Sequence, residues 1–558
     1  MAGGIDIKKA YAALNMPPAR YAAQFVLPLV GTGVAVVVIL RLFAPSLFNG
    51  IFAGLIYAIP LYFALLAAIY PYTVAEGKKN EINNNIHFFI THMGVLATAN
   101  IPRGEIMRML GEKKEYGALA EETRKIFTLV DSWNMALPEA CRFISKRTPS
   151  DIWSDFLDRF AYSIESGEDL ETFLRNEQLV VMEDFATVYR GALYEVENMK
   201  GLFNSMMMSV IFVVIFAILM PVITGIDGTF LMMGAVFLVM CIEIAFVYFI
   251  KAKAPNDPIW HSTKIETDLS KALKKGLPIS LIATLVAVGA AFAFAGHWPP
   301  AILLAIGLTP LAYTGFIVGR EEEKVKRRDD NFAAFIRSLG ASTSARGGQV
   351  TETLRHLQTH DFGPLTPDIR QLYSRLNLRV DDEKAWQYFA ADCGSNLIAK
   401  FSNMFVEGVK AGGKADVIGR IISENFVSIV TLRKSRYQTA SNFKGLLYGL
   451  VAGMSFSLYV GVSIVGMLKR IFMEVQLPEN TPFASFLNFS FDMALVGFLI
   501  LILMLAHSMA SGMMLHIAAG GNYFRTYFDL PLMFWVAAIV SVFAERALGR
   551  LLGGGLGG

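Results

Sequence analysis

The stretch AYSIESGEDLETFLRNE, residues 161–177, places a glycine between two amphipathic segments. Much later, FVEGVKAGGKADVIGRIISEN, residues 405–425, repeats this arrangement. Gly167 and Gly413 lie 246 residues apart. The residue just past a helix end often adopts a left-handed conformation, which glycine adopts without strain. The two stretches therefore predict two helix–turn–helix joints, with Gly167, Gly412 and Gly413 as the turn residues.

A constant offset of 246 residues also aligns residues 320–446 with residues 76–203. Both segments carry apolar residues at three- and four-residue spacing, which predicts amphipathic helices packed as bundles. The aligned pairs include Phe89 and Phe335, Gly94 and Gly340, Gly117 and Gly363, and Gly167 and Gly413. Because span order, helical stripes and glycines agree without a gap, the sequence predicts an internal duplication.

The composition indicates a membrane protein. The chain has 558 residues, of which 54% are hydrophobic and 17% charged, and its mean hydropathy is +0.46. A membrane-spanning helix needs about 20 mostly apolar residues. Nine stretches qualify, at about 22–44, 51–75, 204–223, 229–251, 277–296, 300–318, 447–468, 489–514 and 528–545. The predicted fold class is all-α, a polytopic helical membrane protein with two homologous cytoplasmic bundles.

The distribution of Lys and Arg predicts the orientation. The loops at 45–50, 224–228 and 296–299 carry neither residue, whereas 252–276 is rich in lysine. By the positive-inside rule the N-terminal tail, 76–203, 252–276 and 320–446 are cytoplasmic, and the protein lies in the cell membrane. The predicted parts are a tail (1–21), spans (22–75), first bundle (76–203), spans (204–251), basic linker (252–276), spans (277–319), second bundle (320–446), and spans with a Gly-rich tail (447–558).

The two bundles carry opposite net charges. The first has 15 Lys and Arg against 21 Asp and Glu, a net charge of −6, and the second has 20 against 15, a net charge of +5. Complementary potentials favour docking of the bundles together, or their facing different partner surfaces. The candidate partner contacts are Arg327, Arg328, Arg337, Arg346, Arg355, Arg370, Arg375 and Arg379. In a membrane protein with basic cytoplasmic segments, the overall net charge of +3 is no evidence of nucleic-acid binding, and no nucleic-acid partner is expected.

A known family shares these features. A helical bundle ending in FAYSIESGEDLETFLRNE, followed by a long helix into the membrane and occurring twice, resembles the type II secretion F domain superfamily. The chain length, the nine spans and the stretch THMGVLATANIPRGEIMRML, residues 91–110, are similar to its archaeal branch, which includes the assembly platforms of the archaellum. The resemblance covers most of residues 50–470 and is looser in the second bundle.

The resemblance implies a mechanical function. A platform of this family sits in the membrane beneath a filament of pilin-like subunits and docks on a cytoplasmic hexameric ATPase. ATPase movements would pass through the platform to the filament base. The sequence leaves open whether the filament is an archaellum or another type IV pilus, whether it rotates, and whether the chain acts as a monomer or a homodimer.

Little in the chain suggests enzyme chemistry. There is no G-x-x-x-x-G-K-[ST] phosphate loop, so nucleotide hydrolysis is assigned to a partner. His356 and His360 stand four apart, but HLQTH lacks the glutamate of a zinc protease motif, and a solvated face is the simpler interpretation. We predict no catalytic residue, no cofactor, no metal and, from three dispersed cysteines, no disulfide framework.

One intramembrane charge suggests the alternative function, a secondary transporter or channel. Glu243 lies inside a predicted span, where a carboxylate is costly and functional by default. As a proton or cation site it would serve transport, whereas an interhelical hydrogen bond is the structural alternative. No basic partner for it can be identified from the sequence. Transporter repeats also place binding residues at the bilayer midplane, and here the spans are almost devoid of charge.

Overall fold

The computed structural model describes residues 7–14, 16–43, 54, 56–224, 228–261, 263, 265–294, 296, 298–474 and 493–553. Over these residues the chain is helical and contains no strand, apart from one isolated bridge between Trp260 and Ser395. The prediction of an all-α membrane protein is confirmed. The last residues of the predicted Gly-rich tail, 554–558, lie outside the described part.

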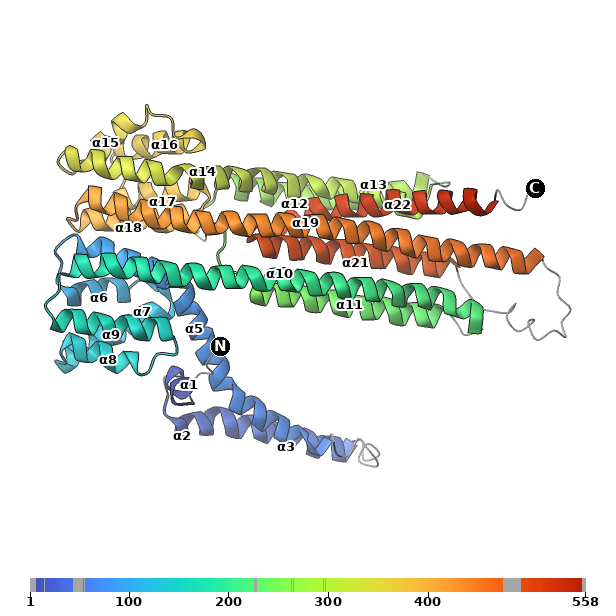
Figure 1. The fold of residues 1–558 in the computed structure, drawn as a ribbon, viewed down its shortest axis with the longest axis horizontal. Helices are drawn as coiled ribbons and strands as arrows, with labels where there is room; N and C mark the ends of the chain where they lie inside the picture. The colour runs from blue at the N-terminus through green and yellow to red at the C-terminus, as the bar shows by residue number, and fades with distance from the viewer. Residues whose placement is uncertain are drawn as a thin grey trace. The chain divides into compact units, whose positions relative to one another are not determined.

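The helices of the N-terminal half begin with α1 (Ile7–Ala13), α2 (Pro18–Tyr21), the π-helix η1 (Ala22–Val26) and α3 (Leu27–Phe43). They continue with α5 (Ile59–Ala97), α6 (Arg103–Gly111), the 3₁₀ turn η3 (Lys114–Tyr116), α7 (Ala118–Trp133), α8 (Leu137–Ser145), α9 (Asp151–Glu165), α10 (Leu170–Thr224) and α11 (Gly228–Lys253). Long helices α5 and α10 extend from apolar sequence into the first bundle, and α6 to α9 complete it (Figure 1).

The C-terminal half begins with α12 (Asp268–Phe294), α13 (Pro300–Leu308), the 3₁₀ turn η4 (Thr309–Leu311), α14 (Ala312–Ala345) and α15 (Val350–Leu357). Then come the 3₁₀ turn η5 (Gly363–Leu365), α16 (Thr366–Asn377), α17 (Asp382–Cys393), α18 (Asn396–Lys410) and α19 (Ala415–Glu474). The chain finishes with α21 (Met493–Ala519), the 3₁₀ turn η6 (Tyr523–Arg525) and α22 (Thr526–Gly553).

The helices of the two bundles correspond one to one at the predicted offset. Adding 246 to the bounds of α6, α8, α9 and α10 reproduces those of α15, α17, α18 and α19 within about four residues. The aligned glycines also behave alike. Gly94 and Gly340 each lie where a Cβ would collide with the long helix that follows, at Gln178 and at the carbonyl of Ala415. This agreement in order, length and close contacts supports the predicted duplication.

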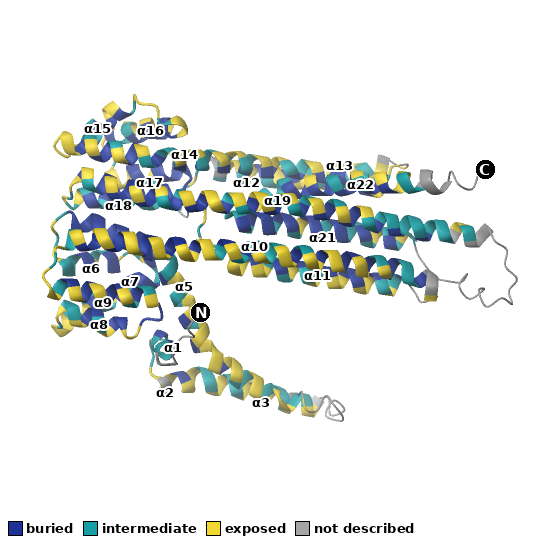
Figure 2. Ribbon diagram, viewed as in Figure 1, coloured by how far each residue is buried: buried dark blue, intermediate teal, exposed yellow. Residues whose placement is uncertain are grey.

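The chain forms two compact units. Unit 1 comprises residues 1–185, 337–349 and 404–425, and unit 2 comprises residues 186–336, 350–403 and 426–558. Unit 1 therefore groups most of the first bundle, residues 76–185, with the ends of three helices of the second bundle. Burial in α5 changes along its length: most residues from Ile82 to Ala97 are buried, while its apolar N-terminal half is largely exposed (Figure 2).

Nine helices of the described residues are long and apolar enough to cross a membrane. Each of the nine predicted stretches overlaps one of them, while residues 44, 51–53, 55, 295 and 489–492 of these stretches lie outside the described part. In unit 2 the apolar parts of α10, α11, α13, α19, α21 and α22 share one buried core. Large apolar side chains such as Phe237 on α11 and Leu285 on α12 are exposed, as expected where lipid covers them.

Two local features were not foreseen. The sixth span is interrupted at η4, where Pro310 has no N–H to donate to a regular helix. The predicted basic linker is fastened to the second bundle: the N–H of His261 donates to Gly394 at 3.2 Å and that of Asn396 to Ile259 at 2.9 Å. Its last residues already belong to α12, which begins at Asp268.

Candidate functional site

The glycine stretches form matching turns. After α9 the N–H of Gly167 donates to Ile164 at 3.3 Å and that of Glu168 to Ser163 at 3.1 Å. After α18 the N–H of Gly412 donates to Val409 and that of Gly413 to Gly408. Both are Schellman motifs, which satisfy the last carbonyls of a helix with a left-handed residue.

The left-handed residues are Gly167, with φ +74°, and Gly412, with φ +89°. In conformation, therefore, Gly167 corresponds to Gly412, one residue before the alignment partner Gly413. Gly413 meets a different requirement, because a Cβ there would lie 2.5 Å from the hydroxyl of Thr98. Each of the two turns directly precedes a long helix, as the sequence predicted. The role of these turns as joints remains a prediction.

Helices α10 and α19 run unbroken from these turns into the apolar region. They contain 55 and 60 residues, which at 1.5 Å per residue corresponds to about 80 and 90 Å. The start of α10 is capped by Asp169, whose carboxylate accepts the N–H of Thr172 at 2.9 Å. Each of these two helices therefore connects a bundle directly to the apolar region.

Within unit 1, helix α18 carries an acidic contact to the first bundle. Glu407 forms an ion pair with Lys113, and Nε2 of His92 lies 3.1 Å from its carboxylate. The other ring nitrogen of His92 lies 2.9 Å from the hydroxyl of Tyr116. Burial raises the pKa of Glu407, but hydrogen bonds and charge from His92 and Lys113 outweigh it and hold the pKa at about 2.

The net charges did not identify this contact. Glu407 belongs to the basic second bundle, and Lys113 belongs to the acidic first bundle. The ion pair between Glu407 and Lys113 therefore joins an acidic residue of the basic bundle to a basic residue of the acidic bundle. Gly408 allows close packing beside it, since a Cβ there would lie 2.3 Å from a side-chain methyl group of Val95.

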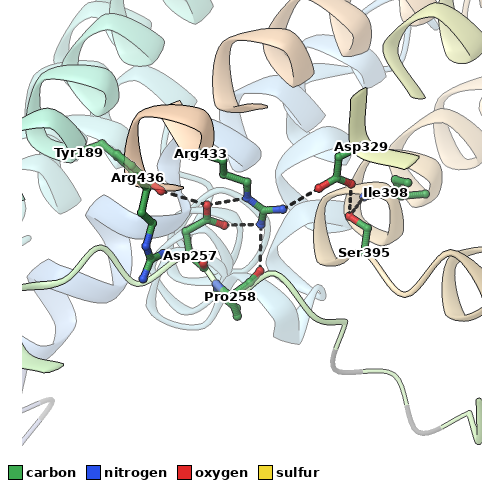
Figure 3. A network of polar contacts seen from close by, with 8 residues as sticks. All are labelled: Tyr189, Asp257, Pro258, Asp329, Ser395, Ile398, Arg433 and Arg436. Carbon is green, nitrogen blue, oxygen red and sulfur yellow. Dashed lines mark hydrogen bonds and ion pairs between the residues drawn. The ribbon is translucent and has the colours of Figure 1, made fainter. Parts of the chain in front are cut away.

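Within unit 2, α19 carries a buried cluster that we call the arginine hub, composed of Arg433, Arg436, Asp257 and Asp329 (Figure 3). Arg433 is 2% exposed, and two of its guanidinium nitrogens donate to the carboxylate of Asp257, at 2.8 and 2.6 Å. A third nitrogen donates to Asp329 of α14 at 3.0 Å. The planar guanidinium suits this forked geometry, which the single ammonium of lysine cannot reproduce.

Other groups complete the arginine hub. Ser395, at the start of α18, donates to Asp329, and the hydroxyl of Tyr189 on α10 donates to Asp257 at 3.4 Å. Arg436 donates to the carbonyls of Ala518 and Ile517 at 2.7 and 3.0 Å. These carbonyls end α21 and lack partners within the helix, so a cation is favourable there. Two arginines and two aspartates make the cluster neutral while joining α10, α14, α19, α21 and the linker.

The eight candidate arginines have different surroundings. Arg328 is internal to the second bundle, with its Nε 2.8 Å from Asp368, and Arg375 pairs with Asp392 at 2.7 Å. Arg337 donates to Ser423 at 3.0 Å, and together with the exposed Arg346 it belongs to unit 1. The remaining four, all exposed and all in unit 2, are Arg327, Arg355, Arg370 and Arg379.

Three of the exposed arginines lie in or just after helices α15 and α16. The carbonyl of Gln358 accepts from Arg370 at 3.3 Å, and the side chain of Gln358 donates to the carbonyl of Arg355. Arg379 follows α16, with φ +56°. We call Arg355, Arg370 and Arg379 the α15–α16 basic face. None of these side chains is held by a buried carboxylate among the described residues, in contrast to Arg328.

Glu243 has the partner that the sequence did not reveal. His507 of α21 approaches it from 264 residues away, with its Nδ1 2.6 Å from the carboxylate. Both side chains are buried in the apolar core of unit 2. The pair joins α11 to α21 and gives the intramembrane carboxylate a hydrogen-bond donor.

The alternative metal site has no support in the structure. Among the described residues, no three His, Cys, Asp or Glu side chains are grouped so that they could hold a metal ion. His356 lies on the exposed surface of α15, 3.6 Å from Glu352. The three cysteines are free thiols.

Comparison with known proteins agrees with this architecture. The family described as type II secretion system (T2SS), protein F, matches residues 89–225, from the first bundle through the membrane part of α10. The flagella accessory protein J of Methanocaldococcus jannaschii is 35% identical over 551 residues, covering 97% of both chains. The chain belongs to the flagella accessory protein J family.

A second member of the flagella accessory protein J family, from Methanococcus voltae, is 36% identical over 97% of this chain and 98% of its own. No solved structure matches the chain. As a member of this family, the protein is a multi-pass membrane protein of archaellum assembly.

The family-matched region, residues 89–225, contains Gly167 and α10 but none of the four residues of the arginine hub. Sequence reasoning overlooked the hub because Asp257, Asp329 and Arg433 are separated by up to 176 residues and each stands among ordinary charged residues. One signal was present: Arg433 and Arg436 lie one turn apart, just before the apolar stretch that begins at about 447.

Proposed function

We propose that this chain is the membrane platform of an archaellum or related archaeal type IV filament. In this role it couples a cytoplasmic hexameric secretion-type ATPase to the insertion of pilin-like subunits and growth of the filament. The bundles lie on the cytoplasmic side, as the positive-inside rule predicts. Nucleotide hydrolysis belongs to the ATPase, and the chain supplies the mechanical connection.

The observation that carries the proposal is the pair of continuous helices. Each bundle ends in a helix of 55 or 60 residues that enters the apolar region without a break. Because the joint before each helix is a single glycine turn, a push on a bundle is delivered to the membrane rather than absorbed in a flexible linker. The names and near-complete coverage of the relatives support the same role.

The α15–α16 basic face is the proposed ATPase contact. Arg355, Arg370 and Arg379 are exposed, so their reversal leaves the interior of the bundle intact. Arg375 is excluded from this test because its pair with Asp392 joins α16 to α17. Attraction between exposed charges weakens as salt rises, because the Debye length shortens.

The first prediction concerns copurification with the ATPase encoded in the same organism. We expect the full-length protein to retain the ATPase at low salt, and Arg355→Glu/Arg370→Glu/Arg379→Glu to lose it by tenfold or more. The control Arg124→Glu/Lys146→Glu changes exposed cations of the first bundle and should bind normally. Unchanged binding of the triple variant at low and high salt would remove this face as the dock. No binding by the unaltered protein would contradict the platform function itself.

A further inference from the structure

A basic groove lies where α14 leaves the apolar region. It is enclosed by α14 and by the turn from η6 into α22, and its volume is about 660 Å³. This is within the range of roughly 300–1,000 Å³ that ligand pockets occupy. All of its lining residues belong to unit 2.

Aromatic side chains and glycines shape one end of the groove. A Cβ on Gly315 would lie 2.2 Å from the backbone nitrogen of Phe528, so only glycine permits this approach of α14 and α22. The rings of Phe316 and Phe528 stand 6.4 Å apart, and Phe316 is 55% exposed. This end offers apolar surface to whatever occupies the groove.

Four cations line the other end: Arg320, Lys324, Arg327 and Arg525. Arg525 is fixed, because its Nη1 donates at 2.6 Å to Glu322, a buried carboxylate that also accepts the N–H of Asn522. Lys324 pairs with Glu321 and Arg327 with Glu323, all on the surface of the same helix. Such exposed pairs contribute little, so these side chains can turn toward another anion at small cost.

Arg320 is the cation best placed to bind a ligand. It is exposed and directly follows the apolar run of α14. Among the described residues, no carboxylate or carbonyl is paired with its side chain. The acidic residue of the groove, Glu323, is engaged by Arg327 at 3.4 Å.

The depth of the groove matches the membrane–water boundary. The apolar run of α14 ends at Gly319, and Tyr313, Tyr523 and Phe524 are exposed beside it. Aromatic belts of this kind mark the headgroup level. On α12, a Cβ at Gly276 would lie 3.9 Å from Ile317, which sets Lys274 and Lys275 near the same level.

We propose that this groove binds the phosphate headgroup of an anionic membrane phospholipid. The phosphate lies among Arg320, Lys324 and Arg525, and the first carbons of the chains lie against Phe316. Basic pockets between membrane helices recognise anionic headgroups in this way. The bound lipid would brace the base of α14 against α22, and the proposal does not depend on the ATPase.

The test uses the full-length protein, delipidated in detergent. Phosphatidylglycerol is titrated against phosphatidylcholine with the same chains, and bound lipid is counted by native mass spectrometry. We expect saturable binding of phosphatidylglycerol. Arg320→Gln/Lys324→Gln should weaken it about fivefold per charge removed, the equivalent of about 1 kcal/mol each. Arg525 is kept, because its loss would strand the buried Glu322.

Two controls separate a site from general attraction. The variant Arg320→Lys/Lys324→Arg preserves charge and should bind within twofold of the unaltered protein. Lys275→Gln removes a cation at the same depth outside the groove and should also leave binding unchanged. Each variant is first checked for helical content and monodisperse elution.

Three results would overturn the proposal. Equal binding by Arg320→Gln/Lys324→Gln and the unaltered protein would exclude the groove. An equal loss in Lys275→Gln would show diffuse attraction to a charged surface. Complete competition by millimolar inorganic phosphate would identify a site for free phosphate rather than lipid.

Discussion

At the scale of residues, Gly167 shows how a backbone conformation can be essential where no side chain makes contact. A Cβ at Gly167 would meet nothing within 4 Å, so space does not require glycine there. The requirement comes from φ +74°, a region that L residues enter at a cost of roughly 1–2 kcal/mol. Gly413 is the opposite case, with an ordinary φ and a crowded Cβ position.

Gly167→Val should therefore destabilise the first bundle by about 1–2 kcal/mol through its backbone alone. Gly167→Asn should cost less, since asparagine tolerates the left-handed region. Gly191→Val, an open glycine inside α10, is the matched control and should be close to neutral. Thermal unfolding in detergent measures the stabilities, and filament assembly in cells measures function. Normal filament assembly by the Gly167→Val protein would remove the joint from the mechanism.

At the scale of elements, the arginine hub decides where a long helix is held. The guanidinium of Arg433 joins α19 to α14 and to the linker by pairing with the buried Asp329 and the largely buried Asp257. The neighbouring Arg436 joins α19 to the end of α21. Inside a protein, removing one partner of a buried ion pair leaves an uncompensated charge and typically costs about 3–5 kcal/mol. Gly520 is tied to the same cluster, because a Cβ there would lie 2.5 Å from Arg436.

Arg433→Met should accordingly lower the free energy of unfolding by about 3–5 kcal/mol. Arg433→Lys should recover only part of the loss, since lysine cannot donate to Asp257 and Asp329 as a fork. Lys434→Met removes the neighbouring cation, which is 63% exposed and forms a surface pair with Asp330, and should change stability by less than about 0.5 kcal/mol. Thermal unfolding of the three variants decides the matter: equal effects at 433 and 434 would show that the hub is not structural.

At the scale of the whole molecule, Glu407 of the second bundle contacts the first bundle. Its pKa is held at about 2, below the ordinary value of 4.5. A lowered carboxylate pKa contributes stability that is fully present above the unfolded pKa and is lost as the pH falls toward the folded pKa. The contact should therefore be complete at pH 7 and weaken between about pH 4.5 and pH 2.

Glu407→Gln should destabilise the protein at pH 7 by about 1–2 kcal/mol, reduced from the full pKa difference because the side chain is partly exposed. The difference from the unaltered protein should shrink at pH 4 and further at pH 3. A double-mutant cycle with Lys113→Met isolates the pair. Glu424→Gln, whose partner Arg337 lies 3.7 Å away at the surface, is the control with little expected effect. A pH-independent difference would contradict this account of Glu407.

The sequence by itself determined what depends on local order along the chain. Nine apolar stretches predict spans because a bilayer demands about 20 apolar residues in a row, and the described helices agree. The paired glycines predicted the turns, because a helix end is a local event. The one-residue shift from Gly413 to Gly412 was missed, since two adjacent glycines can each take the left-handed position.

Only the tertiary structure decided which charges are paired and which are exposed. His507 meets Glu243, Asp257 meets Arg433, and Lys113 meets Glu407, in each case across more than 170 residues of chain. Of the eight candidate arginines, Arg328 is paired inside the second bundle, whereas Arg370 is exposed. Spacing and composition do not encode these outcomes, because the energy of a charge depends on its burial and its neighbours, and both are set only when distant helices pack together.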